Sequence, residues 1–150
     1  MLAVSMLCLG LIIYNIAASY PLGASTSPYP PQAFLRDAGL YLHEQALDGS
    51  VGAWNAGIIG YYQGGTVINL DGLVNNDIYA YAISNRLPSY VAERRITYVV
   101  DFKTMLDIPE YRMRGGYDDD TFLGGLRPIK LFDHGEYPPW QYLTLYQVAR

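Results

Sequence analysis

The chain has 150 residues, enough for one domain with a hydrophobic core and too few for two typical domains. Hydrophobic residues make up 51% of the sequence and charged residues 16%, which excludes the highly charged composition of a disordered chain. The net charge is -4 and the 10 Lys and Arg residues form no basic run. Nucleic acid, which binds to clustered cations, is therefore excluded as a partner.

The first segment of the chain is apolar. No charged side chain lies between Leu2 and Ser19, and a stretch of this length is just sufficient to cross a hydrocarbon layer of about 30 Å as a helix. Tyr20 adds a ring of the kind that prefers the membrane interface, and Pro21 then stops the helix. We therefore predict a transmembrane helix at residues 2–20, with membrane lipid as a partner.

Other interpretations of this segment stay open. Ala17, Ala18 and Ser19 are small residues typical of a signal-peptide cleavage site, although the usual positively charged region before the apolar run is missing. The segment can also be a buried helix of a soluble fold, or the last helix of a longer membrane protein. With a membrane helix, we expect the rest of the chain to form an extracytoplasmic domain at the cell membrane.

A linker and an amphipathic helix are predicted next. Residues 21–31 are rich in Pro, Ser and Gly, which resist helix formation, so we expect a linker there and a domain over residues 32–150. Apolar residues recur at intervals of three and four from Pro31 to about residue 48, and Gly49 follows as a stop. This periodicity predicts a helix with one apolar face.

Strands and helices then alternate. Short apolar or β-branched runs predict strands at 51–54, 66–70 and 96–102. Helices are predicted at 56–63, at about 76–84 and in a segment that begins at Pro88. Two glycines inside the first of these helices leave a further strand there as an alternative. The alternation is typical of crossover units over a largely parallel sheet.

The last part of the chain has a different pattern. Residues 110–127 are rich in Gly and Asp, which predicts a loop. Two apolar runs, 128–132 and 142–149, flank the turn-forming residues HGEYPP and predict an antiparallel pair. The predicted fold is therefore a small α/β domain with a largely parallel sheet, flanking helices and a C-terminal antiparallel pair that closes one sheet edge.

The candidate ligand site follows two of the predicted parallel strands. Trp54 and Asn55 come after the first strand, and Asp71 and Asn75 come after the second. Ligands of open α/β sheets bind beyond the carboxyl ends of the strands, so we expect the two groups to be neighbours. Asp71 and Asn75 can hydrogen-bond sugar hydroxyls, and Trp54 or Tyr61 offers a stacking face. The same residue types also serve as turn residues, helix caps and core aromatics.

No motif in the sequence requires a catalytic residue, a metal or a cofactor. The glycines between residues 52 and 65 fit neither a Walker motif nor the dinucleotide fingerprint, and the two histidines lack metal-ligand spacing. Cys8 is the only cysteine, which excludes a disulfide within the chain. Asp101 and Asp107 are a carboxylate pair that can in principle perform acid–base chemistry, but sequence spacing alone does not establish the short distance that such chemistry requires.

Two stretches of the sequence carry a family resemblance. VGAWNAGIIGYYQGGTVINLDGLVNNDIYAY at 51–81 and LPSYVAERRITYVVDF at 87–102 resemble the extracytoplasmic C-terminal region of bacterial polytopic glycosyltransferases of the C superfamily, which use lipid-linked sugars. The resemblance covers roughly residues 10–102. In that family a last transmembrane helix leads into a small α/β domain.

The resemblance implies a domain that assists acceptor or glycan binding, with a lipid-linked sugar or a glycan acceptor as partner. The catalytic carboxylate of that family lies in an early extracytoplasmic loop with no counterpart in this sequence, so the resemblance implies no catalytic residue here. Two alternatives stay open: a noncatalytic module that binds a partner protein through its tyrosines, and a small enzyme that uses Asp71 as acid or base.

Overall fold

The computed structural model describes residues 8–17, 30–133 and 140–149. Most of the predicted linker and the HGEYPP segment between the last two strands lie outside the described residues.

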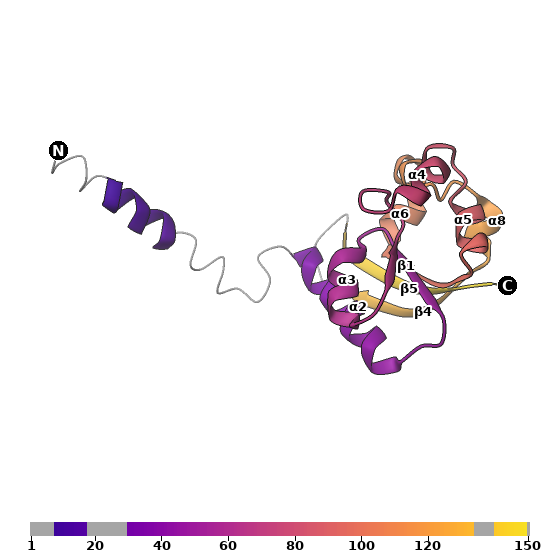
Figure 1. Ribbon diagram of the computed structural model, residues 1–150, viewed down its shortest axis with the longest axis horizontal. Coiled ribbons are helices and arrows are strands. Elements are labelled where there is room, and N and C mark those ends of the chain that lie inside the picture. Colours follow the sequence, from indigo (N-terminus) through magenta and orange to yellow (C-terminus); the bar gives the residue numbers. More distant parts are fainter. Residues whose placement is uncertain (1–7, 18–29, 134–139, 150) are drawn as a thin grey trace.

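A five-stranded mixed sheet forms the centre of the domain (Figure 1). Its strands are β1 (Ser50–Ala53), β2 (Val67–Asn69), β3 (Ile96–Phe102), β4 (Leu126–Asp133) and β5 (Tyr142–Val148). The order across the sheet is β2-β1-β3-β5-β4, in which β1 pairs in parallel with β2 and β3 while β5 pairs antiparallel with β3 and β4. The predicted α/β fold with a C-terminal antiparallel pair is confirmed, and the sheet as a whole is mixed.

Helices cover both faces of this sheet. They are α2 (Pro30–Gln45), α3 (Ala56–Gln63), α4 (Asn76–Ile83), α5 (Leu87–Glu93), α6 (Lys103–Asp107), α7 (Pro109–Gly115) and α8 (Asp120–Gly124). Figure 1 shows α2 and α3 on one side of the strands and α4, α5 and α8 on the other. The two crossovers, from β1 to β2 and from β2 back past β1 to β3, run in opposite directions. Right-handed connections then place their helices on opposite faces.

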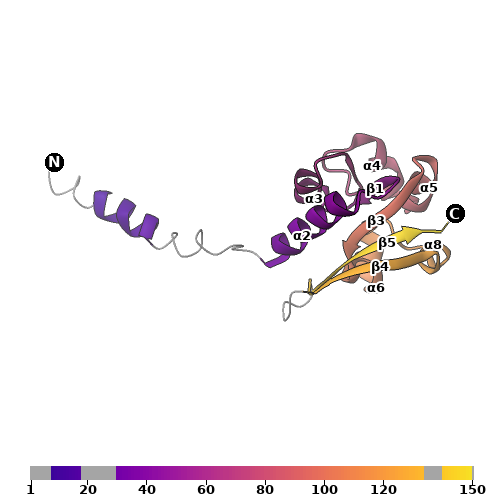
Figure 2. The ribbon, with the colours of Figure 1, turned by 90° about the horizontal axis from the view of Figure 1, so that it is seen from below.

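Burial explains the place of each strand in the sheet. All residues of β3 except Thr97 are buried, as expected of a strand covered on both faces, and β3 lies at the centre. Figure 2 shows β3, β5 and β4 side by side. β4 is an edge strand whose side chains are mostly exposed, and its Pro128 and Lys130 are residues that discourage pairing with another strand.

The predicted amphipathic helix is confirmed as α2, which includes the last two residues of the predicted linker, Pro30 and Pro31. Its apolar face includes the fully buried Phe34 and Ala38. Phe34 meets Phe102 of β3 edge to face, with 6.2 Å between ring centroids, and Tyr41 meets Phe132 of β4 in the same way at 5.7 Å. These contacts join the first helix of the domain to both the parallel and the antiparallel part of the sheet.

The prediction of a loop over residues 110–127 is wrong, because α7 and α8 lie there. Pro109 begins α7 at a first-turn position, and Gly116 ends it in the left-handed conformation, with φ at 74°. Asp119 caps α8 by accepting a hydrogen bond from the backbone N–H of Phe122 at 2.9 Å. The Gly and Asp residues of this region therefore begin and end short helices instead of forming one loop.

The apolar N-terminal segment is described in part. Residues 8–17 form a helix whose described hydrophobic side chains are exposed, among them Leu9, Leu11, Ile12, Ile13, Tyr14 and Ile16. Among the helices of the described residues, none has the length and apolar character needed to cross a membrane. The remainder of the predicted transmembrane segment, residues 2–7 and 18–20, lies outside the described part of the chain.

Candidate functional site

The carboxyl ends of β1, β2 and β3 form one edge of the sheet, and a cleft opens there. The chain leaves β1 toward β2 on one side and later returns to β3 on the other, which makes this edge a topological switch point of the kind that binds ligands. The cleft has a volume of about 290 Å³ and is lined by Leu35, Trp54, Asn55, Ala56, Gly57, Ile58, Asn69, Asp71, Leu73 and Val74. This volume is close to the lower end of the range for ligand pockets, roughly 300–1,000 Å³.

Trp54 and Asn55 lie between β1 and α3, at one wall of the cleft. Trp54 is half-buried, and its indole N–H donates to the backbone carbonyl of Gly115 at 3.3 Å, which holds the ring in place. Asn55 is exposed and precedes the first residue of α3, yet its side chain makes no capping hydrogen bond. The first N–H groups of α3 therefore have no side-chain cap from Asn55, and the first residues of α3 line the cleft together with Asn55.

Asp71 lies in a turn that is closed by hydrogen bonds of its own residues. The Asn69 amide donates to the carbonyl of Trp54 at 3.3 Å, and its oxygen accepts from the N–H of Gly72 at 3.1 Å. The Asp71 Oδ1 atom accepts from the N–H of Leu73 at 2.7 Å, and Gly72 has a φ of 78°, which favours glycine. The predicted proximity of the Trp54 and Asp71 groups is confirmed.

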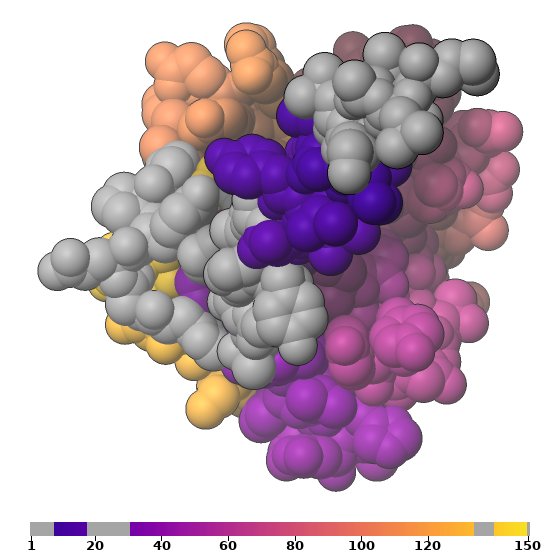
Figure 3. Space-filling model, turned by 90° about the vertical axis from the view of Figure 1, so that its left-hand side faces the viewer, coloured from indigo at the N-terminus to yellow at the C-terminus, as the bar shows by residue number. Residues whose placement is uncertain are grey.

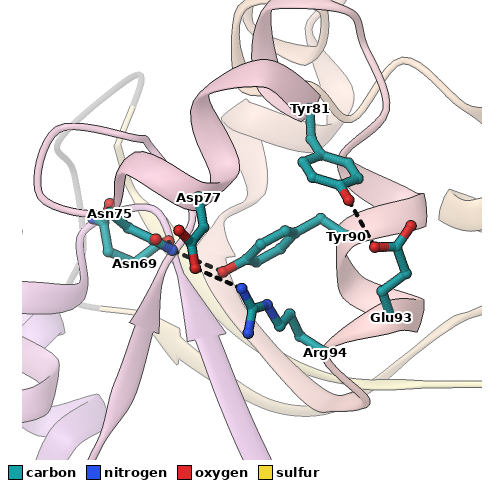
Figure 4. Close-up of polar contacts among 7 residues, drawn as sticks. All are labelled: Asn69, Asn75, Asp77, Tyr81, Tyr90, Glu93 and Arg94. Atoms are coloured by element: carbon teal, nitrogen blue, oxygen red, sulfur yellow. Dashed lines mark hydrogen bonds and ion pairs between the residues drawn. The ribbon is translucent and has the colours of Figure 1, made fainter.

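Asn75 anchors this turn to the helices that follow it. Its amide nitrogen donates to the carbonyl of Asn69 at 2.9 Å and to the hydroxyl of Tyr90 in α5 at 2.9 Å (Figure 4). Beside it, the Arg94 guanidinium forms an ion pair with Asp77 at 2.5 Å. Both amide hydrogens of Asn75 are thus used within the domain, and Asn75 does not line the cleft.

Tyr61 lies on the exposed surface of α3, beyond the turn that lines the cleft. Its side chain is 80% exposed and meets the ring of Tyr62 edge to face, with 5.1 Å between centroids. Of the five residues predicted as ligand contacts, Trp54, Asn55 and Asp71 line the cleft, whereas Tyr61 and Asn75 do not.

A buried carboxyl lies near the same edge of the sheet. Asp101, the penultimate residue of β3, is 1% exposed and accepts hydrogen bonds from the Tyr117 hydroxyl at 2.6 Å and from the N–H of Phe102 at 2.9 Å. Burial raises the pKa of Asp101 to about 7, the two hydrogen bonds oppose this rise, and the charge of Asp71 adds to it.

The sequence contained one signal of this buried carboxyl, since Asp101 interrupts the otherwise apolar strand ITYVVDF. Its partner Tyr117 has no such signal, because it comes from a region that was predicted to be a loop. Asp107, which was considered together with Asp101, forms an ion pair with Lys103 on the surface instead. Asp101 and Asp107 thus have separate partners.

The chemistry of the cleft fits a neutral, hydroxyl-bearing ligand. A hydroxyl group can donate to the Asp71 carboxylate and accept from the Asn55 amide or the first N–H groups of α3. A phosphate would lie next to the Asp71 charge with no lysine or arginine on the lining to compensate it. The Trp54 indole provides apolar contact area. Within the described residues, no three His, Cys, Asp or Glu side chains gather where they could hold a metal ion.

Comparison with known proteins places the chain in a family. The family model described as "Domain of unknown function (DUF8728)" matches residues 28–147, and the chain belongs to this family. A search with this chain finds no match among the curated proteins and none among the solved structures. The matched region begins two residues before α2 and includes every strand of the sheet except the last residue of β5.

Proposed function

We propose that this member of the DUF8728 family is a membrane-tethered extracytoplasmic domain that binds a glycan in the cleft at the carboxyl edge of its sheet. It acts as an accessory domain without catalysis of its own, as in the glycosyltransferases of the C superfamily that its sequence resembles. The observation that carries the proposal is the convergence of Trp54, Asn55 and Asp71 on one cleft.

A sugar uses each kind of group that the cleft contains. The indole of Trp54 offers a flat apolar surface to the C–H face of a sugar ring, and its orientation is held by the bond to Gly115. Asp71 has one oxygen in the turn hydrogen bond, which leaves Oδ2 to accept from a hydroxyl. The exposed Asn55 amide can both donate and accept. Such a small set of orienting polar groups beside an aromatic surface is typical of small-molecule sites.

The membrane tether is supported by the apolar helix at residues 8–17. Its hydrophobic side chains are exposed to solvent, with Leu9 at 58% and Ile16 at 63%, although water is an unfavourable surrounding for such a continuous apolar surface. In the absence of a charged residue between Leu2 and Ser19, a lipid layer is the environment that suits this segment best.

Binding can be measured through the fluorescence of Trp54 in the full chain. The chain has two tryptophans, so a Trp140→Phe background leaves Trp54 as the only indole. Titration with mono- and oligosaccharides is expected to change its emission in a saturable manner. Asp71→Asn should weaken binding by roughly 10- to 100-fold, because a hydrogen bond to a charged acceptor is lost.

Asp48→Asn is the matched control, since Asp48 is exposed just before β1 and does not line the cleft. The control should bind sugar like the parent chain. An emission that responds to no sugar would contradict glycan binding, and a response to a partner protein alone would favour the interaction module. Sugar turnover that Asp71→Asn abolishes would instead indicate an enzyme with Asp71 as acid or base.

A further inference from the structure

The turn after β2 presents two large hydrophobic side chains to solvent. Leu73 and Val74, here called the apolar tip, are each 84% exposed and are the most exposed large hydrophobic residues in the described part of the chain. Two hydrogen bonds hold the tip in place: the Asp71 carboxylate accepts from the N–H of Leu73, and the Asn75 amide donates to the carbonyl of Asn69. An ordered turn therefore keeps two apolar side chains away from the hydrophobic core.

The tip lies at the end of the domain where the chain enters from its N-terminal segment. Leu35 lines the same cleft as Leu73 and Val74, and it is only five residues from Pro30, the first residue of α2. At the rise of an α-helix, this places the entry point roughly 8 Å from Leu35. Figure 3 views the molecule from the side on which α2 begins.

The connection to the apolar helix is short. Residues 18–29 separate the helix at 8–17 from α2, and twelve residues span at most roughly 43 Å even when fully extended. If the apolar segment lies in a bilayer, the first residue of α2 therefore lies within reach of that bilayer, and the tip is on the end of the domain nearest to this entry point.

The occupant that these observations favour is lipid. A stable protein interface buries about 800 Å² on each partner, far more than two side chains can offer, whereas a few apolar side chains suffice to enter the boundary between headgroups and acyl chains. The protein carries a net charge of -4, and no lysine or arginine lines the cleft beside the tip. The contact is thus apolar and does not depend on anionic lipid.

We propose that Leu73 and Val74 insert into the lipid interface of the membrane that holds the tether, so that the cleft opens at the membrane surface. This inference rests on the tether of the proposed function and is independent of whether the cleft binds a glycan. It assigns the exposed tip a partner, a zwitterionic lipid bilayer, and fixes the orientation of the domain relative to it.

Spin labels on the full chain test this orientation. Cys8 is the only cysteine, so a Cys8→Ser background accepts one new cysteine at a time. Val74→Cys places a label on the tip. Ala149→Cys places a control label on an exposed residue that directly follows β5. Because β5 is antiparallel to β3, this residue lies near the amino end of β3, away from the carboxyl ends of the parallel strands. Ile12→Cys places a third label in the apolar helix.

The labelled chains are reconstituted into phosphatidylcholine vesicles, and collisions with oxygen, which concentrates in lipid, are compared with collisions with a water-soluble nickel complex. We expect residues 12 and 74 to favour oxygen and residue 149 to favour the nickel complex, in low and in high salt. A water-exposed label at residue 74 together with a lipid-exposed label at residue 12 would overturn the docking of the tip alone. Water exposure at both positions would overturn the tether as well. Neither outcome bears on glycan binding by the cleft, which the fluorescence titration tests independently.

Discussion

A single buried carboxyl distinguishes β3 from an ordinary core strand. Asp101 is 1% exposed, and its main compensation comes from the hydroxyl of Tyr117, itself fully buried. Burial in an apolar surrounding penalises the charged form of a carboxyl, which is why the pKa of Asp101 rises to about 7 despite two hydrogen bonds. The protonation of this one residue therefore contributes to the stability of the domain as a function of pH.

The sign of this contribution follows from the two pKa values. The ordinary pKa of an aspartate, which applies to the unfolded chain, is 3.8, and burial raises the pKa of Asp101 in the folded domain to about 7. At pH values between these two pKa values, Asp101 is therefore mostly protonated in the folded state and mostly ionised in the unfolded state. The associated stability is fully present below about pH 4 and is lost as the pH rises through 7, by at most about 4 kcal/mol.

Asp101→Asn should remove this pH dependence, because the amide does not ionise while its oxygen still accepts from Tyr117. Urea unfolding at several pH values between 4 and 8 measures the effect as a change in slope of the unfolding free energy. Asp48→Asn, which changes an exposed carboxylate, should leave the slope unchanged. Equal slopes for the parent chain and Asp101→Asn would show that Asp101 is ionised throughout this range.

Close contact between two helices depends on a glycine. A Cβ atom added to Gly39 of α2 would lie 2.6 Å from the carbonyl oxygen of Ile59 and 2.8 Å from the Cβ of Tyr62, both in α3. The backbones of α2 and α3 therefore approach each other more closely than any side chain at residue 39 permits. By contrast, a Cβ atom on Gly57, in the first turn of α3, would meet no atom within 4 Å.

The same substitution should have opposite effects at these two glycines. Gly39→Ala is expected to lower the unfolding free energy by about 1–3 kcal/mol, because one of the helices must shift. Gly57→Ala should raise it by roughly 0.5–1 kcal/mol, since alanine loses less backbone entropy in a helix. Thermal unfolding of both variants checks the pair, and stabilisation by Gly39→Ala would refute the close approach of α2 and α3.

At the scale of the whole molecule, the core is independent of the N-terminal helix. All buried hydrophobic residues among the described ones lie between Phe34 and Leu145, and the family match begins at residue 28. The helix at 8–17 contributes no residue to this core. Folding and the membrane tether are therefore expected to depend on separate parts of the chain.

Deletion of residues 1–29 should release the domain from the membrane without unfolding it. We expect the shortened chain to be recovered in the aqueous fraction with an unchanged melting temperature, because no core contact is removed. Circular dichroism and membrane flotation measure the two properties. A large loss of melting temperature would indicate that the apolar segment packs against the domain, as in the alternative of a buried helix.

The sequence by itself determined the elements with strong local patterns. The run ITYVVDF predicted β3 at its observed limits, because a β-branched strand buried on both faces differs clearly from its surroundings. The periodicity of α2 and the two apolar runs of the C-terminal pair were equally readable. α7 and α8 escaped prediction because they are short, and caps such as Asp119 stabilise them more than any apolar periodicity.

Only the tertiary structure decided which polar residues of the candidate site remain free to meet a ligand. The expectation that both strands are parallel was sufficient to predict that Trp54 and Asp71 are neighbours, since parallel strands end at a common edge. The bonds that orient Trp54 and occupy Asn75 come from Gly115 and Tyr90, which are 61 and 15 residues away in sequence. Local patterns carry no information on such distant partners, and for this reason the availability of each side chain emerges only when the chain is folded.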